Sequence, residues 1–169
     1  FVIDLQDPYS PKVLGVLKIP GYSDYLHPYD ENHIIGIGKD GNVVKISLFD
    51  VSNVTDPKEI DNYKVEGWWS DSPVLSDHKA LLFNGSMNLL VMPITTYNYS
   101  VWDSASTWQG VYVFNITIEE GITLRGSITH VENASDLGYY YLGYPLYYVK
   151  RALYIDNVLY TISDKKVMM

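Results

Sequence analysis

The side chains best suited to chemistry are two adjacent tryptophans and the acidic and imidazole groups that follow them. Trp68 and Trp69 precede Asp71, and the pair Asp77-His78 comes a few residues later. Aromatic rings beside carboxylates suit a sugar ring or a peptide, because the rings supply apolar contact and the carboxylates accept hydrogen bonds. The Asp-His pair could also act as a general acid and base. Its structural alternative is a hydrogen-bonded pair that fixes the start of an inner strand, since buried polar groups are normally paired.

A second aromatic group follows in the chain. It includes Trp102, Asp103 and Trp108, and then the run "YYYLGYPLYY", which begins with Tyr139 and Tyr140. If all these rings share one face of the protein, they form a ligand-binding surface. The alternative is that long loops fold down and use the rings as a small core of their own, and a third possibility is an enzymatic cleft.

Metal-binding motifs are weak. The other histidines lack the close spacing of a zinc motif; they are His27, His33 and His130. The stretches "DENH" at Asp30 and "KDGN" at Lys39 carry oxygen ligands suited to calcium. Both lack the full alternating carboxylate pattern and are better interpreted as hairpin turns, with Gly41 at positive φ. We expect no cofactor, with calcium as the alternative.

Composition excludes several classes of function. The net charge is −8, which disfavours nucleic acid and anionic membrane surfaces. There is no cysteine, so disulfide and thiolate chemistry are excluded. No apolar run approaches the roughly 20 residues of a membrane span. The first residues, "FVIDL", resemble the middle of a strand, so we expect the natural start to lie upstream.

Asparagine sequons suggest the cell surface. Five Asn-x-Ser/Thr sequons occur, against about one expected by chance. The candidate acceptors are Asn53, Asn84, Asn98 and Asn133, whereas Asn115 lies inside a predicted strand. Their excess fits a secreted glycoprotein, although turns are rich in these residue types for other reasons.

The sequence repeats itself. "VIDLQDPYSPKVLGVLKIPG" from Val2 aligns without a gap with "LFDVSNVTDPKEIDNYKVEG" from Leu48. A third copy, "VFNITIEEGITLRGSI", starts at Val113. A second element recurs as "NHIIGIGKDG", "NLLVMPITTY" and "NVLYTISDKK". A period of this size indicates a repeat architecture.

Each repeat reads as four short strands separated by turn signals, which is the pattern of a β-propeller blade. We predict an all-β fold, a partial β-propeller of four-stranded antiparallel blades. Two whole blades are flanked by two half blades, with the third and fourth strands at the start of the chain and the first and second at its end. The predicted boundaries are 1–21 (half blade), 22–67 (blade), 68–131 (blade) and 132–169 (half blade).

Propeller topology tells where the candidate residues lie. Loops between the second and third strands, and loops between blades, share one face of a propeller. Trp68 and Trp69 are predicted on a blade-to-blade loop, and Trp102 and Trp108 on an insertion over residues 95–109. The aromatic residues should therefore gather on that face.

The stretch "FVIDLQDPYSPKVLGVLKIPGYSDYLHPYDENHIIGIGKDG", with "SDHKALLF" and "RALYIDNVLYTIS", resembles a family of archaeal and bacterial secreted proteins. These proteins carry a C-terminal β-propeller distantly related to WD repeats. The resemblance implies a secreted or cell-surface propeller and implies no activity. The terminal "KVMM" departs from the pattern, which suggests an excised fragment.

The predicted function is a non-catalytic extracellular recognition or scaffold module that binds a glycan or peptide, with protein or carbohydrate partners. The alternative is a hydrolase acting on glycans or peptides at the same face. The unpaired strand edges leave two alternatives: a homodimer in which the end of each copy completes a blade with the start of the other and closes a ring of six blades, or a fragment that packs irregularly through the same edges.

Overall fold

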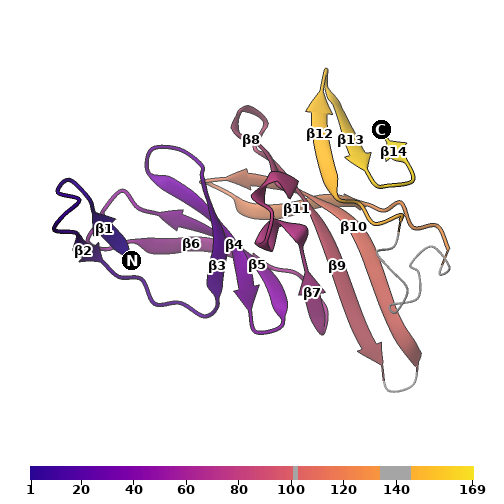
Figure 1. Cartoon of the computed structure of the whole chain (residues 1–169), viewed down its shortest axis with the longest axis horizontal. Helices are drawn as coiled ribbons and strands as arrows, with labels where there is room; N and C mark the ends of the chain where they lie inside the picture. Colours follow the sequence, from indigo (N-terminus) through magenta and orange to yellow (C-terminus); the bar gives the residue numbers. More distant parts are fainter. Residues whose placement is uncertain (101–102, 134–145) are drawn as a thin grey trace.

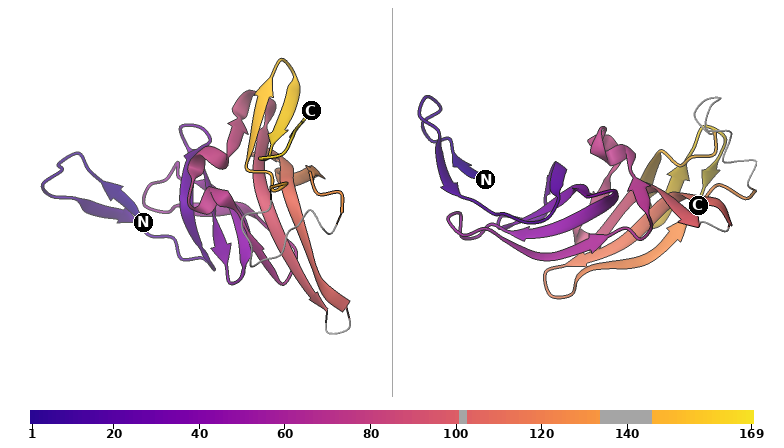
Figure 2. Two further views of the ribbon diagram at one scale, coloured as in Figure 1. Left: turned by 45° about the vertical axis from the view of Figure 1, so that its right-hand side comes forward. Right: turned by 90° about the horizontal axis from the view of Figure 1, so that it is seen from below.

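The computed structural model of the chain describes residues 1–100, 103–133 and 146–169 (Figure 1), and the side chains of 99, 100 and 103–106 lie outside the description. The strands form four antiparallel sheets that follow one another along the chain. Figure 2 shows these sheets as a curved row, with the N-terminal and C-terminal sheets at opposite ends. The arrangement confirms the predicted all-β partial propeller.

The first complete blade is built from strands whose residues alternate between two faces. Its four strands pair in chain order: β3 (Tyr22–Pro28), β4 (His33–Asp40), β5 (Val43–Asp50) and β6 (Lys58–Lys64). The β4–β5 hairpin turns at Gly41, whose φ of +59° confirms the predicted turn conformation, which glycine adopts without steric cost.

The second blade has a divided inner edge. β7 (Trp69–Asp71) and β8 (Leu82–Asn84) both pair with β9 (Leu89–Ser100), at different places along it. Two 3₁₀ turns, Pro73–Leu75 and His78–Ala80, join β7 to β8, and a third, Gly85–Met87, precedes β9. β8 therefore begins only at Leu82, because His78–Ala80 form the second 3₁₀ turn.

The remaining strands of this blade are long. β9 pairs with β10 (Asp103–Thr117), and β10 pairs with β11 (Gly121–Ile128). The β9–β10 ladder extends outward as far as Ser100 opposite Asp103. Residues 95–100 and 103–109, the described parts of the predicted loop insertion, instead lengthen the two strands, because paired strands satisfy their own backbone hydrogen bonds.

The terminal sheets are smaller. β1 (Val2–Asp4) pairs with β2 (Lys12–Gly15) at the N-terminal end. At the other end, β12 (Arg151–Ile155) pairs with β13 (Val158–Ile162). A short third strand that the sequence analysis did not predict, β14 (Val167–Met168), pairs with β13.

Apolar side chains hold neighbouring sheets together face to face. One cluster joins the two complete blades and includes Ile35, Ile46, Leu90 and Phe114, all fully buried. A smaller cluster joins the second blade to the C-terminal sheet. The core of the protein is thus a series of interfaces between sheets.

Hydrogen bonds from buried polar side chains accompany these apolar contacts. The Ser70 hydroxyl accepts from the Val44 backbone N–H at 2.7 Å. The Gln109 amide group donates to the Val149 carbonyl at 2.9 Å and accepts from the Val149 N–H at 2.8 Å. The first bond joins the two complete blades, and the other two join β10 to the segment that leads into β12, so they fix the position of one sheet against the next.

His130 makes a similar link between the second blade and the C-terminal sheet. The side chain is fully buried, with Nε2 2.8 Å from the Thr161 hydroxyl and Nδ1 2.9 Å from the Ser163 hydroxyl. Burial lowers the pKa of His130, and the nearby positive charge of Lys166 lowers it further. The imidazole is therefore held in its neutral form, which the two hydroxyl groups can satisfy.

This arrangement predicts a loss of stability on acidification. His130 has a lower pKa in the folded protein than in the unfolded chain, where it titrates near 6.5. The contribution of His130 to the free energy of unfolding is complete above pH 6.5 and declines as the pH falls through that value. Below it, the unfolded chain binds a proton at His130 that the folded protein does not bind. Thermal unfolding of the native chain and of His130→Asn should show a shallower pH dependence for the variant between about pH 7 and 5. Equal slopes would contradict the assignment; Leu124→Ala is the control and should keep the native slope, since it changes an exposed side chain that does not titrate.

A glycine in β10 makes a second prediction. A Cβ atom added to Gly110 would overlap the backbone carbonyl oxygen of Ile128 and lie 2.8 Å from the Trp108 ring, whereas one added to Gly126 meets nothing within 4 Å. Gly110→Ala should cost about 1–3 kcal/mol of unfolding free energy in urea titration. Gly126→Ala should be neutral or stabilising, because alanine loses less backbone entropy on folding. Equal stability of the two variants would show that the close approach at Gly110 is absent.

Candidate functional site

The candidate site is a group of aromatic and charged side chains at the junction of the two complete blades. We name it the Trp68 cluster, and its members are Lys39, Trp68, Trp69, Asp71 and Tyr97. Trp68 is 66% exposed. The Trp69 ring meets the Tyr97 ring edge-on, with centroids 5.1 Å apart. The Lys39 ammonium lies 4.8 Å from the centre of the Trp69 ring and 3.2 Å from an Asp71 carboxylate oxygen.

Strand register brings this cluster together. In the β7–β9 ladder Trp69 lies opposite Tyr97, and the Trp68 N–H donates to the Tyr97 carbonyl at 3.2 Å. The Ser70 N–H donates to the Asn42 carbonyl at 3.0 Å, which ties β7 to the β4–β5 turn. Lys39 lies in β4 close to that turn. In Figure 1 the β4–β5 turn, β7 and the outer part of the β9–β10 hairpin lie toward the same end of the blades.

Trp108 lies apart from this cluster. It is opposite Thr96, one residue along β9 from Tyr97, so its side chain points to the other face of the sheet. There it packs against the core between the two blades, with its ring centroid 5.0 Å from that of Tyr112. Trp108 is therefore part of the main core between the blades, and belongs neither to the predicted ligand-binding face nor to a separate core made by loops. Trp102, Tyr139 and Tyr140, and the Asp103 side chain, lie outside the described residues.

Trp69 and the Asp77-His78 pair also lie in other secondary-structure elements than predicted. Trp69 begins β7 and so is part of a strand, because the blade-to-blade connection is shorter than expected. Asp77 and His78 open the second 3₁₀ turn, where an inner strand was predicted to begin.

Asp77 has both carboxylate oxygens engaged. One accepts from the Lys79 backbone N–H at 3.1 Å, and the other lies 2.7 Å from an Arg151 guanidinium nitrogen. Arg151 also donates to the Lys79 carbonyl at 2.6 Å, so it joins β12 to the turn. The Lys79 N–H and Arg151 lower the pKa of Asp77. The side chain is therefore a carboxylate cap and a link between sheets.

His78 takes part in aromatic packing. Its ring stacks on Tyr25, with centroids 5.4 Å apart and planes 23° apart. Tyr25 in turn places its hydroxyl 2.9 Å from Nδ1 of His27. The imidazole is thus oriented by a neighbouring blade, whereas its sequence neighbour Asp77 turns to Arg151.

Three residues that contribute to these contacts were not predicted from the sequence: Lys39, Tyr97 and Arg151. Lys39 was noted only as part of a turn, and Tyr97 lay in the predicted insertion. Arg151 carried a usable signal, because "KRALY" matches "HKALL" in the preceding repeat and so stands where the next inner strand begins.

The sequons and the calcium candidates occupy surface turns and strands. Asn53, Asn98 and Asn133 are exposed, Asn84 is partly buried, and Asn115 lies in β10. Asp30 accepts from the Asn32 N–H at 2.7 Å and lies 2.8 Å from Nδ1 of His33, as a hairpin turn requires. Within residues 1–100, 103–133 and 146–169, no three acidic, histidine or cysteine side chains converge as a metal site. In the same residues, no helix has the length and apolar character of a membrane span.

Two archaeal proteins are similar to this chain along almost its whole length. An uncharacterised protein of Methanocaldococcus jannaschii is 40% identical over 163 residues, which cover 96% of this chain and 21% of the relative. One of Archaeoglobus fulgidus is 35% identical over 167 residues, 99% of this chain and 22% of the relative. The chain thus spans about a fifth of the length of the curated relatives it matches. No solved structure matches.

A family model described as "Beta propeller domain" matches residues 1–169, the whole of the chain. The four successive sheets, the repeat that generates them and this match lead to the same assignment. The chain belongs to the β-propeller domain family.

Proposed function

We propose that the chain is a non-catalytic recognition or scaffold module that binds a glycan or a peptide at the Trp68 cluster. The observation that carries the proposal is the exposure of Trp68, the largest apolar side chain type, beside a ring already engaged by a cation. Covering an exposed tryptophan ring removes a large apolar surface from water, which contributes favourably to the free energy of binding. Propeller domains in general suit binding and scaffolding, because their loops meet at the ends of rigid blades.

The polar members of the cluster, Lys39 and Asp71, could orient a bound ligand through hydrogen bonds. Lys39 and Asp71 form an ion pair, so their charges largely offset one another at the surface. Their remaining hydrogen-bonding capacity is suited to sugar hydroxyl groups or to a peptide backbone. An apolar ring beside a neutral polar pair therefore favours a glycan or a peptide.

The hydrolase alternative has less support from the geometry. General acid catalysis needs a carboxyl group whose pKa is raised, and the neighbours of Asp77 lower its pKa. Both Asp77 oxygens are occupied, and His78 stacks on Tyr25. These contacts favour a structural role for the pair.

We further propose that the protein is displayed at the cell surface or secreted. The exposure of Asn53, Asn98 and Asn133 supports this location, because glycosylation needs accessible acceptors. An extracellular module with a tryptophan at its surface would meet glycans and other surface proteins, which are the partners proposed for it.

The Trp68 assignment is tested by substitution. Trp68→Ala should reduce binding on a glycan and peptide array by at least tenfold, because the ring provides the main apolar contact. Leu124→Ala is the matched control, since Leu124 is also an exposed apolar residue but lies away from the cluster on β11. Array signals that survive Trp68→Ala unchanged, or fall equally in both variants, would contradict the proposed site.

The structural role of Asp77 is tested separately. Asp77→Ala should lower the urea midpoint of unfolding, because the turn loses its cap. Asp77→Asn should lower it less, since asparagine still caps and the half-exposed ion pair with Arg151 contributes little to stability. Neither variant should alter array binding. Hydrolysis of a glycan or peptide by the native chain that disappears in Asp77→Asn would favour the enzyme instead.

A further inference from the structure

The sequon at Asn98 lies beside the Trp68 cluster. Asn98 is exposed on β9, one residue beyond Tyr97, and Ser100 completes the Asn-x-Ser pattern. The Trp68 N–H donates to the Tyr97 carbonyl, so the chain at Trp68 runs next to this part of β9. A ring proposed to bind sugars therefore has an acceptor sequence for an attached sugar next to it.

Gly67 locates the Asn98 carboxamide more closely. A Cβ atom added to Gly67 would lie 3.1 Å from Oδ1 of Asn98. Gly67 directly precedes Trp68, and consecutive Cα atoms are only about 3.8 Å apart. The carboxamide thus lies against the backbone that leads into Trp68. A glycan on Nδ2 of Asn98 would start at the side of the Trp68 cluster.

An attached sugar has an advantage over a free ligand at this ring. Trp68 is 66% exposed, so covering it removes a large apolar surface from water. A sugar held on Asn98 makes this contact within one molecule, at an effective concentration on the order of millimolar. It also loses little translational freedom when it does so, because attachment has already restricted it. A free ligand of ordinary affinity would be displaced.

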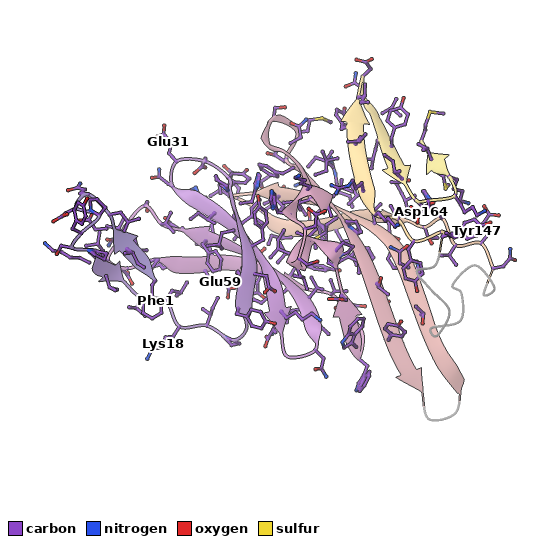
Figure 3. The ribbon with its side chains drawn as sticks, in the orientation of Figure 1. Phe1, Lys18, Glu31, Glu59, Tyr147 and Asp164 are labelled. Carbon is purple, nitrogen blue, oxygen red and sulfur yellow. The ribbon has the colours of Figure 1, made fainter. Side chains whose placement is uncertain are left out.

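Asn53 provides a comparison within the same chain. It is also exposed, in the turn between β5 and β6, where its Oδ1 accepts from the Thr55 N–H at 3.1 Å and from the Thr55 hydroxyl at 2.8 Å. The Val51 N–H donates to the Asn32 carbonyl at 2.8 Å, so this turn adjoins the β3–β4 turn. Figure 3 shows Glu31 of the β3–β4 turn at the end of the first blade away from the β4–β5 turn.

The two exposed sequons therefore lie at different distances from the Trp68 cluster. The cluster adjoins the β4–β5 turn, and the length of β5 separates that turn from Asn53 by about 25 Å, since a strand rises about 3.3 Å per residue. The first sugars of a glycan on Asn53 would not reach Trp68, whereas those of a glycan on Asn98 would begin beside it.

We propose that Asn98 is N-glycosylated and that the first sugars of this glycan cover Trp68. The proposal rests on the ligand-binding role and the extracellular location proposed above, and it adds a regulation of that site. Chains modified at Asn98 have a covered Trp68 cluster, and unmodified chains have an open one. Asn115 stays unmodified, because β10 is paired with a strand on each side of it.

The modification transfers a glycan from a lipid phosphate carrier to the Asn98 side chain. Nδ2 forms a bond to C1 of the first sugar, and the bond from C1 to the phosphate oxygen breaks. The lipid phosphate leaves with the electron pair of that bond, and Nδ2 loses one of its two protons to solvent. Oδ1 is unchanged, so its place beside Gly67 is kept in the product.

The first test identifies the modified asparagines in the protein purified from its native cells. Mass spectrometry of proteolytic peptides should find a glycan on Asn98 and none on Asn115. Ser100→Ala, produced in the same cells, should lose the glycan while Asn98 remains, because the sequon requires its hydroxyl residue. An unmodified Asn98 in the native protein would overturn the proposal.

The second test measures the accessibility of the Trp68 ring by hydroxyl-radical oxidation, read by peptide mass spectrometry. Oxidation of Trp68 should be about threefold lower in the glycosylated protein than in Asn98→Gln or Ser100→Ala, because the sugar shields the ring. Asn53→Gln is the matched control and should keep the low value, since its sequon lies at the other end of the first blade. Equal oxidation in the native protein and in Ser100→Ala would show that the glycan does not cover Trp68.

Binding on the glycan and peptide array separates this proposal from the one on which it rests. Ser100→Ala should bind about tenfold more strongly than the glycosylated native protein, because its ring is open. Asn53→Gln should bind as weakly as the native protein. Equal binding by Ser100→Ala and the native protein would overturn the regulation. If Ser100→Ala binds nothing while Trp68 is still shielded in the native protein, the ligand-binding role fails and the glycan cover is upheld.

Discussion

Burial of apolar sheet faces against neighbouring sheets is the interaction on which the rest of this structure depends. A four-stranded sheet of alternating apolar residues cannot be stable alone, because each face needs a neighbour. Neighbouring sheets bury the side chains of the central strands of each blade, which are β4 and β5 in the first blade and β9 and β10 in the second. The fold is therefore a row, and its stability accumulates interface by interface.

Polar groups are placed in those interfaces so that the sheets stack in one register. Gln109 exchanges two hydrogen bonds with Val149, and the Asp61 carboxylate accepts from the Ile122 N–H at 2.7 Å. His130 does the same with two hydroxyl groups. Each bond would be lost if one sheet slid along the next, and an unpaired buried polar group is costly. Apolar contact supplies the attraction between sheets, and the polar pairs select its geometry.

The candidate site lies in the middle of this row, where the two complete blades meet at one of their solvent-exposed ends. Strand pairing brings Trp69 and Tyr97 together, and the adjacent blade contributes Lys39. Trp68 is left at the surface by the same arrangement. Asp77 and His78 are drawn instead into contacts that position the inner edge of the second blade. Residues close together in one segment therefore have different roles: Trp68 and Trp69 belong to the candidate binding site, and Asp77 and His78 stabilise the fold.

The sequence by itself determined the repeat, the all-β class and the strands of the first blade, because alternation and turn residues are local signals. It also identified the tryptophan pair as the side chains to consider first. Only the tertiary structure decided that Trp108 packs into the core while Trp68 is exposed, since a shift of one residue along a strand reverses the face. The contacts of Asp77 with Arg151 and of Trp69 with Lys39 join residues far apart in the chain or on different sheets. No local pattern encodes such contacts, because they depend on how one sheet is stacked on the next.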